Sequence, residues 1–67
     1  MVHRLSPIEK QILKVLLEHD YYLSTREVSI KARISWNTAF NYLKEFHKKD
    51  WIAHMRRGNR NYWRAFR

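Results

Sequence analysis

The stretch "STREVSIKARISWNTAFNYLKEFHKKDWI" (residues 24–52) contains two helix starts separated by a very short connection. Ser24 and Glu27 have the spacing of a capping box, in which each side chain binds the backbone N–H of the other residue. The first helix is expected to end at about Ala32 or Arg33, and Ser35 can cap the next helix. A connection this short makes two helices cross rather than lie antiparallel.

The second of these helices, predicted at about residues 35–49, has an apolar face and a polar face. With Ala39 as the core direction, Tyr42, Leu43 and Phe46 fall on the same side at about 100° per residue. The opposite side carries a continuous row of two amides and two lysines: Asn37, Asn41, Lys44 and Lys48. Asparagine is a poor helix former, so its repetition here favours contact with a ligand over simple exposure to solvent.

The N-terminal part predicts another helix with a wide apolar face. "SPIE" at residues 6–9 is a capping box with proline at the first helical position. The apolar face covers more than half of the circumference, so the helix is buried on two sides or meets another subunit. A homodimer is therefore expected, with the aromatic C-terminal strand and four candidate surface residues on or near this helix: Leu5, Leu13, Val15 and Leu17.

After Asp50 the pattern changes to that of strands. "WIAHM" and "NYWRAF" flank "RRGNR", and Gly58-Asn59 tolerates positive φ at both positions, as a tight hairpin loop requires. We therefore expect a two-stranded β-hairpin over about residues 51–66, with Arg56, Arg57 and Arg60 at its tip. A two-residue loop would place Met55 opposite Tyr62, and Trp51 opposite Phe66. Residues 21–23 are expected to be a short extended connection.

Composition and charge define the class of molecule. The chain has 67 residues, which fits one small domain over residues 1–67. It has no cysteine, which excludes disulfides and thiolate zinc sites. The net charge is +8, and residues 44–67 hold eight Lys and Arg against two acidic residues. This asymmetry indicates a polyanionic partner rather than a uniformly solvated basic surface.

Other classes of function find little support in the sequence. The four histidines (3, 19, 47 and 54) form no i, i+4 pair, so no metal or other cofactor is expected. His19 falls on the apolar face of its helix and is expected to pack there. No glycine-rich phosphate loop, cysteine nucleophile or cluster of acids is present, so we expect no enzyme. No apolar run approaches the roughly 20 residues of a membrane span, and no secretory signal is evident, which predicts a cytoplasmic protein.

Taken together, the elements resemble a winged helix-turn-helix domain over the whole chain. Residues 24–52 are similar to its capped second helix, turn and serine-capped recognition helix, and "RRGNRNYW" (56–63) is similar to its wing. The resemblance implies an α+β, mostly α fold of three helices and a C-terminal β-hairpin wing. It is similar to small regulators of the multiple-antibiotic-resistance and arsenical-resistance types. Two positions depart from the family, which usually has glycine where this chain has Arg33 and Asp50.

The resemblance and the charge together imply a sequence-specific regulator of transcription that binds double-stranded DNA, with a repressor as the first expectation. The recognition helix would enter the major groove and the wing would contact the backbone or minor groove. A small-molecule effector is not expected, because no sensory domain is evident. The candidate DNA-binding residues are Arg26, Trp36, Asn37, Thr38, Phe40, Asn41, Lys44, Lys48, Arg56, Arg57, Asn59 and Arg60.

Some of these assignments have alternatives. Trp36 lies at the edge of the apolar face and could pack there instead of contacting DNA. Phe40 could contact a thymine methyl group, or pack on the hairpin or on a partner. For the whole protein, the alternatives are a non-specific architectural protein for DNA or RNA, and a winged-helix module that binds other proteins.

Overall fold

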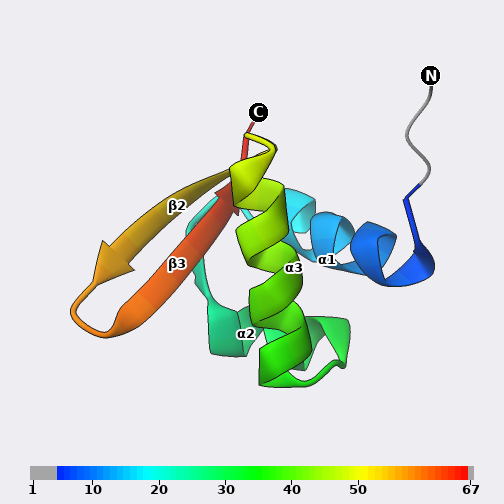
Figure 1. Cartoon of the computed structure of the whole chain (residues 1–67), viewed down its shortest axis with the longest axis horizontal. Helices are drawn as coiled ribbons and strands as arrows, with labels where there is room; N and C mark the ends of the chain where they lie inside the picture. Colours follow the sequence, from blue (N-terminus) through cyan, green and yellow to red (C-terminus); the bar gives the residue numbers. More distant parts are fainter. Residues whose placement is uncertain (1–4, 67) are drawn as a thin grey trace.

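The computed structural model describes residues 5–66, and the ends of the expected domain, with His3, lie outside them. Figure 1 shows three helices and a hairpin that projects beside the third helix. The elements in chain order are α1 (Pro7–Glu18), β1 (Leu23–Ser24), α2 (Thr25–Ala32), α3 (Trp36–Lys48), β2 (Ile52–Arg57) and β3 (Arg60–Ala65).

The helices begin where the caps predict. In α1 the Glu9 N–H donates to Ser6 Oγ at 3.2 Å, and the Ser6 N–H donates to Glu9 Oε1 at 2.9 Å. The same reciprocal pair forms between Ser24 and Glu27 at the start of α2. Ser35 caps α3 by accepting the N–H of Thr38 at 3.1 Å. Each cap satisfies backbone donors that a helix start leaves without an intrahelical partner.

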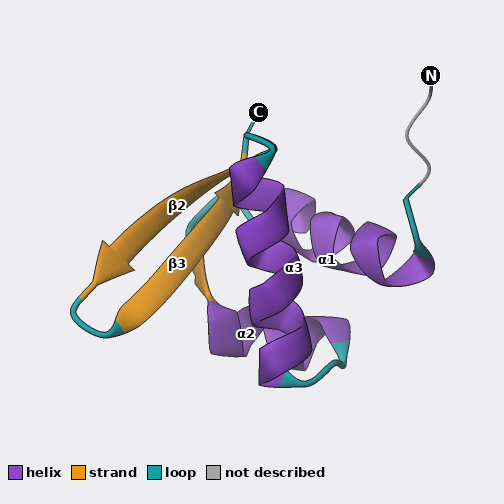
Figure 2. Ribbon diagram, viewed as in Figure 1, coloured by secondary structure: helices purple, strands orange, loops and turns teal. Residues whose placement is uncertain are grey.

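The sheet has one strand more than the sequence analysis expected. Its order is β1-β3-β2, all antiparallel, so β3 is the central strand. The extended connection before α2 pairs with β3 through Leu23 with Trp63 and Ser24 with Tyr62. Figure 2 shows this sheet on one side of the helices. The expectation of a two-stranded hairpin was therefore incomplete, because a strand of two residues is too short to show alternation.

The hairpin register is largely the predicted one. Arg57 pairs with Arg60 around a two-residue loop. Gly58 has φ of 60°, but Asn59 does not have a positive φ, so the expectation of positive φ at both loop positions is corrected. Met55 lies opposite Tyr62, as expected.

The expected pair of Trp51 and Phe66 is corrected. The ladder ends at Ile52 and Ala65, so both aromatic residues lie beyond it. Trp51 stacks instead on Phe46, with ring centroids 5.4 Å apart, while Phe66 is 57% exposed. Packing against α3 buries more of the indole than an edge pair at the open end of a hairpin would.

Side chains from all three helices and from the sheet form one hydrophobic core. Its fully buried side chains include Ile12 of α1, Val28 of α2, Leu43 and Phe46 of α3, and Ile52 of β2. Trp63 of β3 is 2% exposed, and its Nε1–H donates to Thr25 Oγ1 at 2.9 Å. This bond satisfies a buried indole donor and joins the central strand to the start of α2.

The two positions where the family usually has glycine both adopt left-handed backbone. Arg33 ends α2 with φ 58° and ψ 45°, and Asp50 follows α3 with φ 60°. The Arg33 N–H donates to Ile30 O, and the Ile34 N–H donates to Ser29 O. The turn thus keeps the geometry of a glycine turn while carrying a residue that prefers other backbone angles.

Candidate nucleic-acid interface

Helix α3 presents its polar row to solvent. Ala39, Leu43 and Phe46 are completely buried, which confirms the predicted core direction, and Tyr42 is half-buried beside them. The opposite row is exposed at all four positions: Asn37, Asn41, Lys44 and Lys48. The amide and ammonium groups on this row are therefore available to a ligand along several turns of the helix.

A second face of α3 is aromatic and turns toward the hairpin. The rings of Trp36 and Phe40 stack with centroids 4.9 Å apart, and Phe40 meets Trp63 edge-on at 6.3 Å. Lys44 places its Nζ 4.7 Å from the centre of the Phe40 ring. Of the alternatives for Phe40, packing on the hairpin is the one the structure shows. Trp36 contributes to the same packing but remains 47% exposed.

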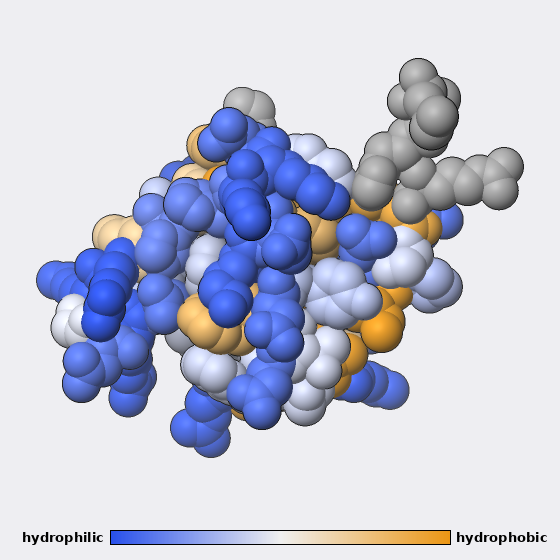
Figure 3. All heavy atoms as spheres, viewed as in Figure 1, coloured by the Kyte–Doolittle hydropathy of each residue, from blue (hydrophilic) through white to orange (hydrophobic). Residues whose placement is uncertain are grey.

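The hairpin tip concentrates positive charge. Arg57, Asn59 and Arg60 are exposed, and so is Arg56. The Arg56 Nε–H donates to Gly58 O at 3.2 Å, so this side chain also supports the turn. Figure 3 shows hydrophilic side chains gathered over the hairpin and along the visible face of α3. The hairpin and α3, which carry all the predicted DNA-binding residues except Arg26, thus both present hydrophilic side chains on this face of the molecule.

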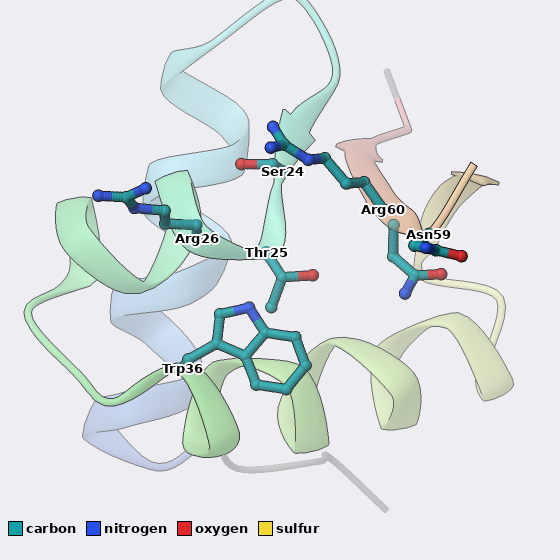
Figure 4. Close-up of a pocket in the computed structure, with 7 residues that line it drawn as sticks. Ser24, Thr25, Arg26, Trp36, Asn59 and Arg60 are labelled. Atoms are coloured by element: carbon teal, nitrogen blue, oxygen red, sulfur yellow. The ribbon is translucent and has the colours of Figure 1, made fainter. Parts of the chain in front are cut away.

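Two hollows lie between this helix and the rest of the domain. The first, of about 270 Å³, opens between the start of α2, the start of α3 and the hairpin tip. Figure 4 shows the Arg60 side chain extending from the hairpin toward Ser24, whereas the Arg26 side chain points away from the indole of Trp36. The lining residues of the first hollow are Ser24, Thr25, Arg26, Trp36, Asn59, Arg60 and Asn61.

The second hollow contains a cluster that sequence reasoning missed. The rings of His47 on α3 and His54 on β2 are 5.1 Å apart, and His54 Nε2 lies 2.8 Å from Asn61 Oδ1. Lys44 and Lys48 line the same hollow. No sequence signal indicates this cluster, since the two histidines lie on different elements and the spacing between them matches no motif.

The structure brings part of the predicted site together, and Asn37, Thr38, Asn41, Arg56 and Arg57 line neither hollow. The first turn of α3 and the hairpin tip share the first hollow, which joins Arg26, Trp36, Asn59 and Arg60. Lys48, at the other end of α3, belongs to the second hollow. Thr38 is half-buried, and its Oγ1 accepts a hydrogen bond from Ser35 Oγ at 2.8 Å. Its hydroxyl therefore already takes part in the cap of α3.

The candidate dimer residues separate into two groups. Leu17 is 53% exposed, and it lines a shallow apolar hollow on α1 together with Leu5 and Leu13. Val15 is 6% exposed and belongs to the monomer core. Its assignment to a dimer surface is corrected, because the core covers the side of α1 on which it lies.

Residues 5–66 contain no group of three or more His, Cys, Asp or Glu side chains placed to hold a metal ion. His19 is half-buried, as expected, and its Nδ1 lies 2.7 Å from Val15 O. Among the same residues, no helix combines the length and apolar character needed to cross a membrane.

The three helices are followed by a hairpin, and the short strand β1 pairs with β3 as the third strand of the sheet. This arrangement is a winged helix-turn-helix fold, and the β2–β3 hairpin is its wing. Comparison of the sequence with protein-family models and with curated proteins gave no match. Solved structures do match. The zinc-responsive MarR family member ZitR of Lactococcus lactis superposes with a TM-score of 0.78 at 17% identity, covering 98% of this chain and 46% of that chain.

Human N-acetylserotonin methyltransferase, solved in complex with SAM, superposes with a TM-score of 0.77 at 19% identity. That match covers 88% of this chain and 17% of the methyltransferase. The chain therefore spans less than half the length of either neighbour. At these identities the likeness shows the winged-helix fold alone, since one fold serves many functions.

Proposed function

We propose that this protein is a transcriptional regulator that binds double-stranded DNA at specific sequences, and that it acts as a repressor in the cytoplasm. Helix α3 enters the major groove, and the wing contacts the backbone or the adjacent minor groove. The observation that carries the proposal is the row of exposed amides and lysines on α3, beside a wing whose tip holds three arginines.

The groups on α3 suit the edges of bases. Asn37 and Asn41 are one helical turn apart, and an asparagine amide can bind N6 and N7 of adenine together. Lys44 and Lys48 continue the row toward the end of the helix, where lysines reach phosphates or the O6 and N7 of guanine. The amides therefore supply sequence choice, and the lysines chiefly supply affinity.

The groups on the wing suit the backbone. Arg57, Arg60 and Asn59 project from a tight loop, so they reach past α3 to the neighbouring groove. Arginine binds phosphate through two parallel N–H donors and is favoured in narrow minor grooves. Each phosphate neutralised in this way releases a counterion, which makes affinity fall with added salt.

The neighbours lend support at the level of class. ZitR is described as a zinc-responsive member of the MarR family, and its match covers 98% of this chain. The methyltransferase matches over 17% of its own length, so we propose a role without catalysis. We also propose a homodimer through Leu5, Leu13 and Leu17, because a two-fold protein fits a two-fold operator. Sedimentation that shows a monomer at high micromolar concentration, with and without DNA, would remove the dimer.

The test begins with selection of a random duplex library at physiological salt. The enriched site and an unrelated duplex are then titrated by fluorescence anisotropy with variants of α3 and of the wing. Asn41→Ala should weaken the enriched site by about tenfold and leave the unrelated duplex nearly unchanged, since a good bidentate contact is worth about 1–3 kcal/mol. Arg57→Ala should weaken both duplexes alike and reduce the salt slope by about 0.9.

Glu45→Ala is the control, because Glu45 is exposed on α3 one helical turn after Asn41 and its carboxylate repels phosphates. It should not weaken either duplex. Equal losses on every sequence from Asn41→Ala and Arg57→Ala would contradict base readout and favour an architectural protein. Absence of salt-dependent DNA binding would favour a module that binds other proteins.

A further inference from the structure

The first hollow offers a stacking surface that a paired base cannot use. We propose that this hollow, between Trp36 and the wing, takes one unstacked nucleotide of the bound DNA, with its base on the indole and its phosphate at Arg60. The inference rests on the proposed function and deepens it by naming a unit of DNA that the polar row of α3 does not read.

The indole of Trp36 packs on Phe40, and much of the residue still remains exposed to solvent. Its ring already stacks on Phe40 at 4.9 Å and 26°, which uses one face, and 47% of the residue remains exposed. Phe40 in turn rests edge-on against the buried Trp63. The indole is thus held in position by two aromatic residues behind it, as a rigid platform. Aromatic platforms in positively charged grooves bind bases by stacking.

Polar groups surround this platform on the side of the wing. The Arg60 side chain reaches over the hollow toward Ser24 (Figure 4), and Asn59 and Asn61 line it as well. A guanidinium suits a phosphate, and amides suit the edge of a base. Arg26 points away from the indole, so it suits a neighbouring phosphate rather than this nucleotide.

The start of α2 carries a negative charge beside the hollow. Ser24 Oγ accepts the Glu27 N–H at 3.1 Å, and the Glu27 carboxylate accepts the Ser24 N–H at 3.0 Å. This carboxylate repels a phosphate close to Ser24. Of the two arginines that line the hollow, Arg60 extends toward Ser24 while Arg26 points away from the indole, which places the phosphate at Arg60 on the wing side.

The volume of the hollow suits an occupant of the size of one nucleotide. The hollow measures about 270 Å³, near the roughly 300 Å³ at which small-molecule sites begin. A paired base in a duplex is stacked on both sides and shows only its edges to a protein. The face of a base becomes available in a single strand, or when the nucleotide is extruded from a duplex. Both sources present the same chemistry.

The experiment compares ligands that differ only by the presence of one base. Four fluorescent DNAs are used: a duplex with a single bulged thymidine, the same duplex with an abasic bulge, a thymidine single strand, and its abasic counterpart. Affinities are measured by anisotropy for the wild type, Trp36→Ala, Trp36→Phe and Arg60→Ala. Circular dichroism and thermal melting verify that each variant folds.

The wild type should bind the thymidine ligand at least about fivefold more tightly than its abasic partner, the lower end of measured stacking effects. Trp36→Ala should remove this ratio, and Trp36→Phe should keep part of it. Arg60→Ala should weaken both members of a pair and keep their ratio. A ratio confined to the bulged duplexes identifies an extruded base, and a ratio confined to the single strands identifies a single-stranded source.

Equal affinities for thymidine and abasic ligands in both pairs would overturn the inference, as would a ratio that survives Trp36→Ala. In either case the fully paired enriched duplex would still bind if the proposed function is correct. If the protein binds none of these DNAs, including the enriched duplex, both the proposed function and this inference are overturned.

Discussion

Replacing Arg33 by glycine should stabilise the protein, although it removes a charged residue from a helix end. Arg33 has φ 58° and ψ 45°, in the left-handed region that L-residues avoid because Cβ crowds the following carbonyl oxygen. Its side chain is exposed. The hydrogen bonds of the turn use backbone atoms, with the Arg33 N–H on Ile30 O at 3.2 Å, so glycine preserves them.

The size of the effect follows from two opposing terms. Left-handed backbone costs an L-residue about 1–2 kcal/mol, and glycine removes this cost. Glycine also loses more conformational freedom on folding than arginine does, which lowers the free energy of unfolding by about 0.5–1 kcal/mol. Arg33→Gly should therefore raise the free energy of unfolding by about 0.5–1 kcal/mol. For a domain of this size that corresponds to a rise of roughly 2–8 °C in Tm.

The assay is thermal and urea unfolding followed by circular dichroism, with Arg33→Ala as the control. Both variants lose the guanidinium and its interaction with the end of α2, so the difference between them isolates the backbone term. Glycine should exceed alanine by about 1 kcal/mol. Equal stabilities for the two variants would refute the reasoning, because the cost of the left-handed conformation would then be no larger than the conformational freedom that glycine loses on folding.

Three further substitutions test other parts of the fold by the same unfolding measurements. Thr25→Val should cost about 1–3 kcal/mol because it leaves the buried Trp63 Nε1–H without its acceptor at 2.9 Å; a neutral result would mean that the bond contributes nothing. Gly58→Ala should cost about 1 kcal/mol through φ of 60° alone, since no atom lies within 4 Å of the added Cβ; an unchanged Tm would argue against the tight loop. Ser24→Ala should cost about 1 kcal/mol by opening the capping box of α2, and a loss below a few tenths would indicate that water replaces the hydroxyl.

The features predicted correctly from the sequence are those encoded by neighbouring residues. The capping boxes at Ser6 and Ser24 depend on residues three positions apart, so they fix helix starts without knowledge of the fold. The face of α3 follows from helical spacing around Ala39. Gly58 and Asn59 fix the loop and hence the register of the hairpin.

The features that escaped prediction depend on contacts between distant residues. Strand β1 exists because Leu23 pairs with Trp63, a residue in a different part of the sequence. The apolar face of α1 is so wide that the sequence does not show which side the core covers, and Val15 was therefore expected on the dimer surface. The contact of His47 with His54 arises only when the wing folds back along α3.

At the candidate site, the sequence predicted the polar row and the basic tip but not their joint geometry. Trp36 could be expected to pack or to contact DNA, and the structure shows that packing leaves half of its surface exposed. The hollow beside it requires the relative positions of α2, α3 and the wing. Such tertiary positions follow from the packing of the core as a whole and carry no local pattern.

The short strand β1 gives the wing two parts with different mechanical properties. Near Tyr62 and Trp63 the central strand is held by hydrogen-bonded neighbours on both sides, and the indole of Trp63 is anchored in the core. From Asn61 back to the loop, β3 pairs only with β2, and this two-stranded ribbon twists and bends easily. Amide hydrogens should therefore exchange slowly at the base and rapidly toward the loop. In the proposed complex with DNA, the arginines of the tip would follow grooves of different width while the base keeps the wing at a constant distance from α3.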